Sequence, residues 1–142
     1  MPFSQLVNAQ EVEVVVAGPG DVNRLYLCKG AAQGSTGVSV GPSQTDTSID
    51  TWQFHVGPQL DATKFRRAIA TLSFAGLQES DPGGGAWMSY YLQAFGADFD
   101  DDNGKVKVNV TNSLQMSNPS SSAWASTAIT QLTYDVTILA AV

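Results

Sequence analysis

The chain has 142 residues, of which 43% are hydrophobic and 14% are charged, and its formal net charge is −6. This length suits one domain with a single core, and low charge combined with many small polar residues is typical of β-rich proteins. Seven Lys and Arg residues, scattered apart from Arg66 and Arg67, cannot neutralise a phosphate backbone. Nucleic acid is therefore excluded as a partner, and an anionic membrane surface is disfavoured.

The N-terminal part of the chain alternates strand-like runs with small polar residues. Strands are predicted at residues 11–17 (EVEVVVA) and 24–28 (RLYLC), with a turn at 18–20 (GPG) between them. The Gly-, Ser- and Thr-rich residues 30–47 are predicted to form loops that contain one short strand at 37–40.

From residue 52 onward the strand patterns become longer and more regular. Their members alternate apolar and polar residues or run apolar, and they predict strands at residues 52–56, 68–77, 87–99, 105–110 and 128–142. No segment longer than two turns shows helical periodicity, and the best candidate, residues 60–70, is weak. Seven or eight short strands separated by turn signals predict an all-β sandwich or barrel.

The most charged stretch reads DFDDDNGKVK and begins at Asp98. Asp98, Asp100 and Asp102 have the spacing of the first three ligands of a calcium-binding loop, but the later ligand positions do not match. Asp102, Asn103 and Gly104 separate two alternating runs, which is the strongest short signal for a β-hairpin turn. The turn explains more of these residues, and calcium held by the three aspartates is the alternative.

The sequence holds little material for catalysis or for cofactor binding. It has one histidine, His55, and one cysteine, Cys28, and it lacks the G-x-S-x-G motif. Cys28 cannot form an internal disulfide and is expected to be a small buried apolar residue, while His55 is expected on the surface. We therefore predict a protein that is not an enzyme and that needs no cofactor.

The sequence also bears on targeting. Residues 1–10 (MPFSQLVNAQ) contain neither a basic cluster nor a continuous apolar run, so no secretory signal is expected. No window approaches 18 apolar residues, so no membrane insertion is expected either. These features predict a soluble protein that is cytoplasmic as made or is exported by a leaderless route.

Three stretches in the C-terminal part together resemble the H-type lectins, the galactose- and GalNAc-binding family of snail agglutinins and discoidin C-terminal domains. They are FRRAIATLSFAGL at residues 65–77, YLQAF at 91–95 followed by the hairpin, and WASTAITQLTYDV at 124–136. The resemblance spans residues 52–142. It implies an antiparallel β-sandwich of about six strands that assembles as a trimer or as a dimer of trimers.

The same resemblance implies a division of the chain and a set of partners. Residues 1–50 would be a β-rich N-terminal extension without a family counterpart, and residues 51–142 would form the lectin-like sandwich. Glycans or glycoproteins and further copies of the chain are the implied partners. The alternative is a structural component of a phage tail, a capsid or a secreted assembly that uses the same sandwich without binding sugar.

The resemblance further implies which residues contact the sugar. Trp124 matches the family's aromatic residue, whereas Ala125 and Tyr91 stand where the family has His and Arg. Aromatic faces can cover the apolar side of a sugar ring. The implied carbohydrate-binding residues are Trp124, Tyr91, Tyr90, Asp50 and Ser126. Because Tyr90 and Tyr91 are neighbours in a strand, they must point to opposite faces.

The last predicted strand also bears on assembly. It is longer than most strands and ends in the apolar residues ILAAV. An apolar tail of this kind is better buried than exposed. We therefore expect it to lie between subunits, where a closed oligomer would give weak sugar sites multivalent strength.

Overall fold

The computed structural model describes residues 5–16 and 21–141 and, for Ala94, the backbone alone. It contains the strands β1 (Gln5–Val15), β2 (Arg24–Val40), β3 (Gln44–Val56), β4 (Phe65–Ser80), β5 (Trp87–Asp100), β6 (Lys105–Asn118) and β7 (Ala125–Ala140). No helix occurs within the described ranges, so the all-β prediction is confirmed and the weak helix candidate at residues 60–70 is wrong. The predicted turn at 18–20 and the end of the last predicted strand at residue 142 lie outside the described residues.

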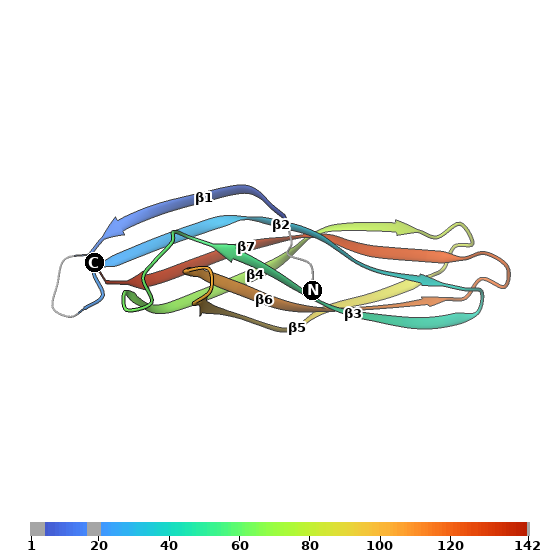
Figure 1. Cartoon of the computed structure of the whole chain (residues 1–142). Helices are drawn as coiled ribbons and strands as arrows, with labels where there is room; N and C mark the ends of the chain where they lie inside the picture. The colour runs from blue at the N-terminus through green and yellow to red at the C-terminus, as the bar shows by residue number, and fades with distance from the viewer. Residues whose placement is uncertain (1–4, 17–20, 142) are drawn as a thin grey trace.

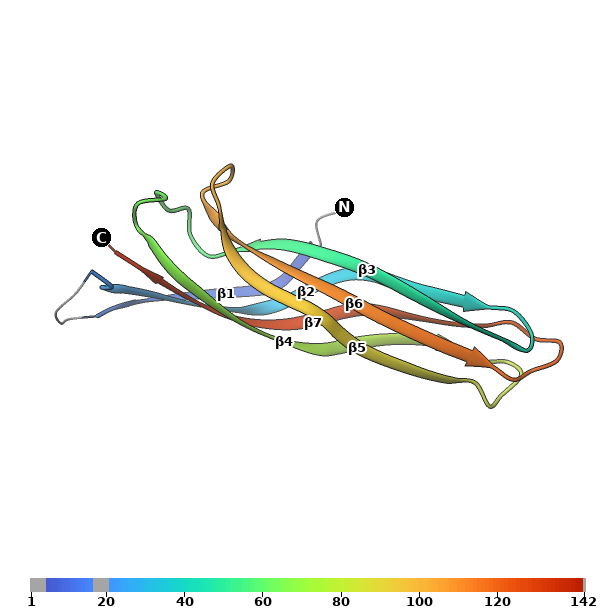
Figure 2. The same ribbon diagram turned by 90° about the horizontal axis from the view of Figure 1, so that it is seen from below.

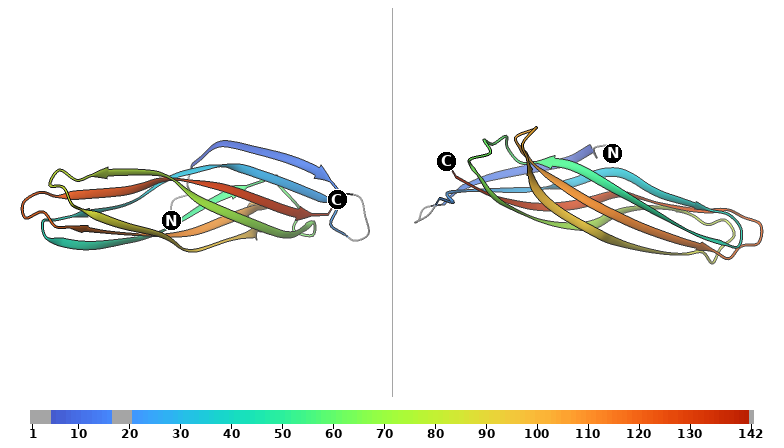
Figure 3. Two further views of the ribbon diagram at one scale, coloured as in Figure 1. Left: turned by 180° about the vertical axis from the view of Figure 1, so that it is seen from behind. Right: turned by 60° about the horizontal axis from the view of Figure 1, so that its bottom comes forward.

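The strands form two antiparallel sheets, one with the order β1-β2-β7-β4 and the other with the order β3-β6-β5. The sheets lie face to face as a long, narrow sandwich (Figures 1 and 2). Strands of both sheets run along the long axis and twist together (Figure 3), as aligned sheet packing requires. The connections β2–β3, β4–β5 and β6–β7 gather at one end of the sandwich, which we call the distal end.

The core lies between the two central strands, β6 and β7. Alternation in KVKVNV places Val106, Val108 and Val110 inward, and each has 0% of its surface exposed. On β7, Val136 and Ile138 face them from the other sheet and are equally buried. Burying a side chain of this kind contributes about 1.5–3 kcal/mol, so these two strands supply much of the hydrophobic stabilisation.

The middle of β2 corrects the prediction of loops at residues 30–47. β2 runs without a break to Val40, and β3 begins at Gln44, so that only residues 41–43 form a connection. Small residues suit this strand because Trp52 packs over Gly34 and donates its indole N–H to Thr36 Oγ1 at 2.8 Å. The strand is held by pairing with β7 and by this tertiary contact, although its own residues have weak strand propensity.

The division between residues 50 and 51 falls inside β3, which pairs with β6 along its whole length. β2 in turn pairs with β7 from Arg24 to Val40. Residues 24–50 therefore contribute strands to the same two sheets as the C-terminal part of the chain.

The predicted hairpin turn is confirmed at residues 101–104, between β5 and β6. Gly104 has φ +64°, a conformation that favours glycine, and its N–H donates to the Asp100 carbonyl at 2.8 Å. The Asp100 carboxylate faces His55, with 2.7 Å between Oδ2 and Nε2, so His55 is a half-buried partner of the hairpin and not a free surface residue. No group of three His, Cys, Asp or Glu side chains arranged to hold a metal occurs among the described residues.

Within the apolar end of β7, Ile138 and Ala140 are buried in the chain's own core, so these two side chains do not lie between subunits, while Leu139 is partly exposed. Ile138 and Ala140 are both 0% exposed because β7 is flanked by β2 and β4 and covered by the other sheet. Cys28 is buried and free, as predicted. Within residues 5–16 and 21–141 there is no helix with the length and apolar character needed to cross a membrane.

Candidate functional site

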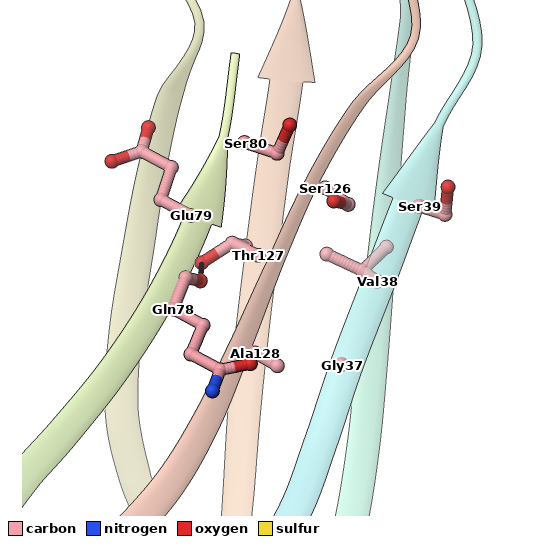
Figure 4. A pocket seen from close by; sticks show the side chains of 9 residues that line it. All are labelled: Gly37, Val38, Ser39, Gln78, Glu79, Ser80, Ser126, Thr127 and Ala128. Carbon is pink, nitrogen blue, oxygen red and sulfur yellow. Dashed lines mark hydrogen bonds between the residues drawn. The ribbon is translucent and has the colours of Figure 1, made fainter.

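A depression of about 560 Å³ lies near the distal end of the four-stranded sheet, over β2, β7 and β4. Figure 4 shows the side chains that line it. Because residues along a strand point alternately to opposite faces, and Ala125 and Thr127 are buried, Ser126 and Ala128 of β7 face outward. The depression is therefore on the outer face of the sheet, away from the core.

Strand pairing places two rows of small residues across this face. One row has three hydroxyls, because Ser126 of β7 pairs with Ser39 of β2 and with Ser80 of β4. In the next row Ala128 pairs with Gly37 and Gln78. Side chains this short leave the face hollow.

Trp124 stands immediately beyond the hydroxyl row, two residues before Ser126. Its side chain lies over Gly41, where an added Cβ would be 3.5 Å from Cη2, and 61% of the residue surface is exposed. Gly41 follows β2 directly, just as Trp124 precedes β7 directly. An exposed indole therefore lies at the same end of the sandwich as the depression, although Trp124 is not one of the residues that line it.

A buried amide holds this end of the sandwich in place. Asn118 Nδ2 lies 3.1, 3.2 and 2.8 Å from the carbonyl oxygens of Val40, Gly41 and Ala123. Its Oδ1 accepts the Ser120 N–H at 3.1 Å. The segment that presents Trp124 is thus tied to the ends of β2 and β6.

The edge of the depression on β4 is fixed by a side chain of β7. Thr127 Oγ1 donates to the Gln78 carbonyl at 3.0 Å, as the dashed line in Figure 4 shows. Glu79 is the only carboxylate among the lining side chains, and in Figure 4 it points away from Ser126. The outward rows are therefore neutral and carry hydroxyls and one amide, groups that both donate and accept hydrogen bonds.

Of the five carbohydrate-binding residues implied by the sequence, only Ser126 lines the depression, and Trp124 stands two residues before it in the chain. Tyr90 faces the interior, where its ring packs on Phe74 at 4.8 Å between centroids and its hydroxyl donates to Asn112 Oδ1 at 3.0 Å. Burial raises the pKa of the Tyr90 hydroxyl to about 12, so it remains a donor.

Tyr91 and Asp50 belong to the other sheet. Tyr91 is 54% exposed on its outer face, so the expectation that the two tyrosines point to opposite faces is confirmed. Asp50 is half-buried, and its Oδ1 accepts the N–H of Thr51 at 2.9 Å. Neither residue lines the depression.

Sequence reasoning missed Ser39, Ser80 and Gln78. They come from two strands that are distant in sequence, and only their common pairing with β7 makes them neighbours. A lone serine in a Gly- and Ser-rich strand carries no local signal of a site. No protein-family model, no curated protein and no solved structure matches the chain.

Proposed function

We propose that this protein binds carbohydrate in the depression between β2, β7 and β4, with Trp124 as the stacking surface. The observation that carries the proposal is an indole, with 61% of its residue surface exposed, two residues before the central serine of a row of three serine hydroxyls. Large aromatic side chains are usually buried or partly buried, so an exposed one beside a polar depression favours a ligand that has an apolar and a hydroxylated side.

A sugar ring has both sides. Its C–H face can cover the indole of Trp124, and its hydroxyls can exchange hydrogen bonds with Ser126, Ser39 and the Gln78 amide. The neutral rows favour a neutral sugar over a sugar phosphate, which would require cationic donors. Nothing in the depression supplies a paired acid and base, so the proposal is binding without catalysis.

The resemblance to H-type lectins makes galactose- and GalNAc-type glycans the first ligands to test. Ala125 is fully buried in the core and cannot serve as the family's sugar-binding histidine does. Tyr91 lies on the other sheet, far in the fold from the depression. Contacts in this chain therefore come from the serine row, and we expect weak affinity at each site.

Self-association would raise the strength of such sites, and we propose a homo-oligomer, a trimer or a dimer of trimers. The supporting observation is a row of exposed apolar residues on the outer face of the four-stranded sheet, away from the depression. Val12, Leu27 and Ile69 are aligned by strand pairing and are 56%, 42% and 52% exposed. The same row favours the alternative function, a structural assembly module without a sugar ligand.

The test is a glycan array followed by titration of each bound glycan against two matched variants. Trp124→Ala should weaken binding about 10-fold or more, the effect of losing ~1.4 kcal/mol or more of stacking. Trp87→Ala removes a second exposed indole, 54% exposed on the other sheet, and should leave affinity unchanged. Absence of binding to any glycan at high protein concentration would favour the structural module, and equal loss in both variants would contradict the proposed site.

A further inference from the structure

A second cavity, of about 230 Å³, lies at the side of the sandwich where the edge strands β1 and β3 face each other. It is separate from the depression near Trp124 and shares none of its lining residues. Residues from both sheets line it, and five of them have side chains that titrate: Glu11, Cys28, His55, Lys105 and Tyr134. The cavity therefore gathers five titratable side chains in a sandwich whose interior is otherwise largely apolar.

Tyr134 is the most informative of these residues. The residue is only 3% exposed, and its ring packs on Phe54 at 5.2 Å between centroids. Its hydroxyl reaches the cavity and has no hydrogen-bond partner among the described residues. The hydroxyl oxygen is not among the buried polar atoms that lack a partner, so water in the cavity can reach it and a ligand would take the place of that water.

The surrounding backbone makes room for this hydroxyl. Gly30 pairs with Tyr134, and a Cβ on Gly30 would lie 2.6 Å from the hydroxyl oxygen and 3.1 Å from the Ala9 Cα. A bulge interrupts β1 between Val7 and Gln10, and Asn8 there has φ +53°, a left-handed conformation that asparagine adopts more readily than most residues other than glycine. Bulges and strained backbone often occur beside functional sites.

The cavity carries opposite charges on its two sides. Glu11, on the edge strand β1, pairs with Cys28 and so points to the same side of the first sheet, where it lines the cavity as an exposed residue. Lys105 begins β6 in the second sheet, and neither residue forms an ion pair with the other in the described structure. His55 also lines the cavity, and its Nε2 atom is in contact with the Asp100 carboxylate.

The two buried groups between these charges stay neutral. Burial, and secondarily the Glu11 charge, raises the pKa of the Cys28 thiol to about 11. Burial also raises the pKa of Tyr134, so near neutral pH its hydroxyl is protonated and can donate a hydrogen bond into the cavity. The cavity is thus lined by a carboxylate and a neutral hydroxyl donor from the first sheet and by a cation from the second.

We propose that this cavity binds a small zwitterion of amino-acid size, whose carboxylate meets Lys105 and the Tyr134 hydroxyl and whose ammonium meets Glu11. Charge-assisted hydrogen bonds of this type are roughly twice as strong as neutral ones, and a ligand with both charges satisfies both sides at once. A ligand with a single charge would leave one side uncompensated.

The test is isothermal titration calorimetry of the full chain with glycine, β-alanine and γ-aminobutyrate, which differ in the distance between their charges. Butyrate and butylamine serve as analogues that lack one charge each. At least one zwitterion should bind saturably and about 10-fold more tightly than either analogue, a difference of ~1.4 kcal/mol. If none of the three zwitterions binds saturably, or if butyrate or butylamine binds as well as they do, the proposal is wrong.

Single-residue variants of the cavity test which side chains contact the zwitterion. Tyr134→Phe removes only the hydroxyl, and Lys105→Gln and Glu11→Gln remove one charge each; each should weaken zwitterion binding about 10-fold. The matched controls Tyr91→Phe and Lys107→Gln change residues outside the cavity and should bind as the unaltered protein does. Binding that survives both Tyr134→Phe and Lys105→Gln would overturn the proposed site even where a zwitterion binds.

Discussion

Asn118 is the single side chain on which the geometry of the distal end most depends. Its amide contacts the carbonyl oxygens of Val40 and Gly41, where β2 ends, and of Ala123, just before β7 begins. The residue is 1% exposed. Removing a buried donor leaves its acceptors desolvated and unpaired, which costs more than the hydrogen bond itself contributes.

We expect Asn118→Ala to lower the free energy of unfolding by about 1–3 kcal/mol and to weaken glycan binding, because Trp124 would lose its support. Urea denaturation and glycan titration measure the two effects. Asn109→Ala is the control: Asn109 accepts a bond from Gln53 on the outer face, far from Trp124 in the fold. Equal loss of glycan affinity in both variants would show that Asn118 does not position the indole.

Thr36 also satisfies a buried hydrogen-bonding group, in this case the indole N–H of Trp52 on β3. Its hydroxyl accepts the indole N–H of Trp52 at 2.8 Å, and both residues are buried. Thr36→Val keeps the shape but leaves that N–H unpaired, so we expect a loss of about 1–3 kcal/mol in unfolding free energy. Thr45→Val, at an exposed hydroxyl of β3 that bonds Ser117, is the control and should change stability little. Equal stability of the Thr36→Val variant and the unaltered protein would contradict this account.

At the scale of elements, the β5–β6 hairpin carries a pH-dependent contact. Hydrogen bonds from His55 and then from Asn103 lower the pKa of Asp100 from its ordinary value of 3.8 to about 2. A carboxylate with a lowered folded-state pKa stabilises the fold above the unfolded-state value, and this contribution is lost as pH falls through the folded-state value.

We therefore expect the urea midpoint to fall between about pH 4 and pH 2, with a smaller fall in Asp100→Asn. Asp101→Asn, in the same turn, is the control and should follow the unaltered protein. Parallel pH profiles for the unaltered chain and Asp100→Asn would refute a role for this carboxylate.

The elements differ in how far the sequence predicts them. The first part of β6, residues 105–110, was predictable because KVKVNV alternates strictly, whereas its continuation to Asn118 was not predicted. The hairpin turn was predictable because Asn103 and Gly104 suit its backbone. The middle of β2 was not, because Gly, Ala, Ser and Thr there carry no apolar period. Those residues form a strand because β7 pairs beside them and Trp52 covers Gly34, both of which are long-range contacts.

The candidate site likewise combines residues that the local sequence suggests with residues that only long-range strand pairing brings near. Trp124 and Ser126 lie two residues apart in one motif, so the sequence could suggest both. Ser39 and Ser80 join them only through the pairing order β2-β7-β4, in which a strand from the N-terminal part lies beside the last strand. Strand order of this kind depends on the whole fold, and no local pattern encodes it. The cavity around Tyr134 depends on the same long-range order.

For the whole molecule, the two sheets present different outer faces. The face of β3, β6 and β5 carries hydroxyl and amide side chains together with Trp87 and with Ile49 and Tyr91, which lie on either side of Ser113; these three large residues are each more than half exposed. The face of β1, β2, β7 and β4 carries the serine row at the distal end. Farther along it lies the apolar row that includes Leu27 and Ile69. Because Val12 and Leu27 pair directly and are both exposed, the four-stranded face is the one expected to associate, since exposed apolar surface marks interaction sites.

Two isoleucines with nearly equal exposure allow a matched test of that expectation. Ile69 is 52% exposed within the apolar row, and Ile49 is 57% exposed on the other sheet. Light scattering of the unaltered chain should give a mass that is a multiple of the 15.0 kDa protomer. Ile69→Lys should shift it toward the monomer, since a lysine must be desolvated at the interface, whereas Ile49→Lys should keep the oligomer. A monomeric mass for the unaltered chain, or dissociation caused by Ile49→Lys alone, would remove the four-stranded face as the association surface.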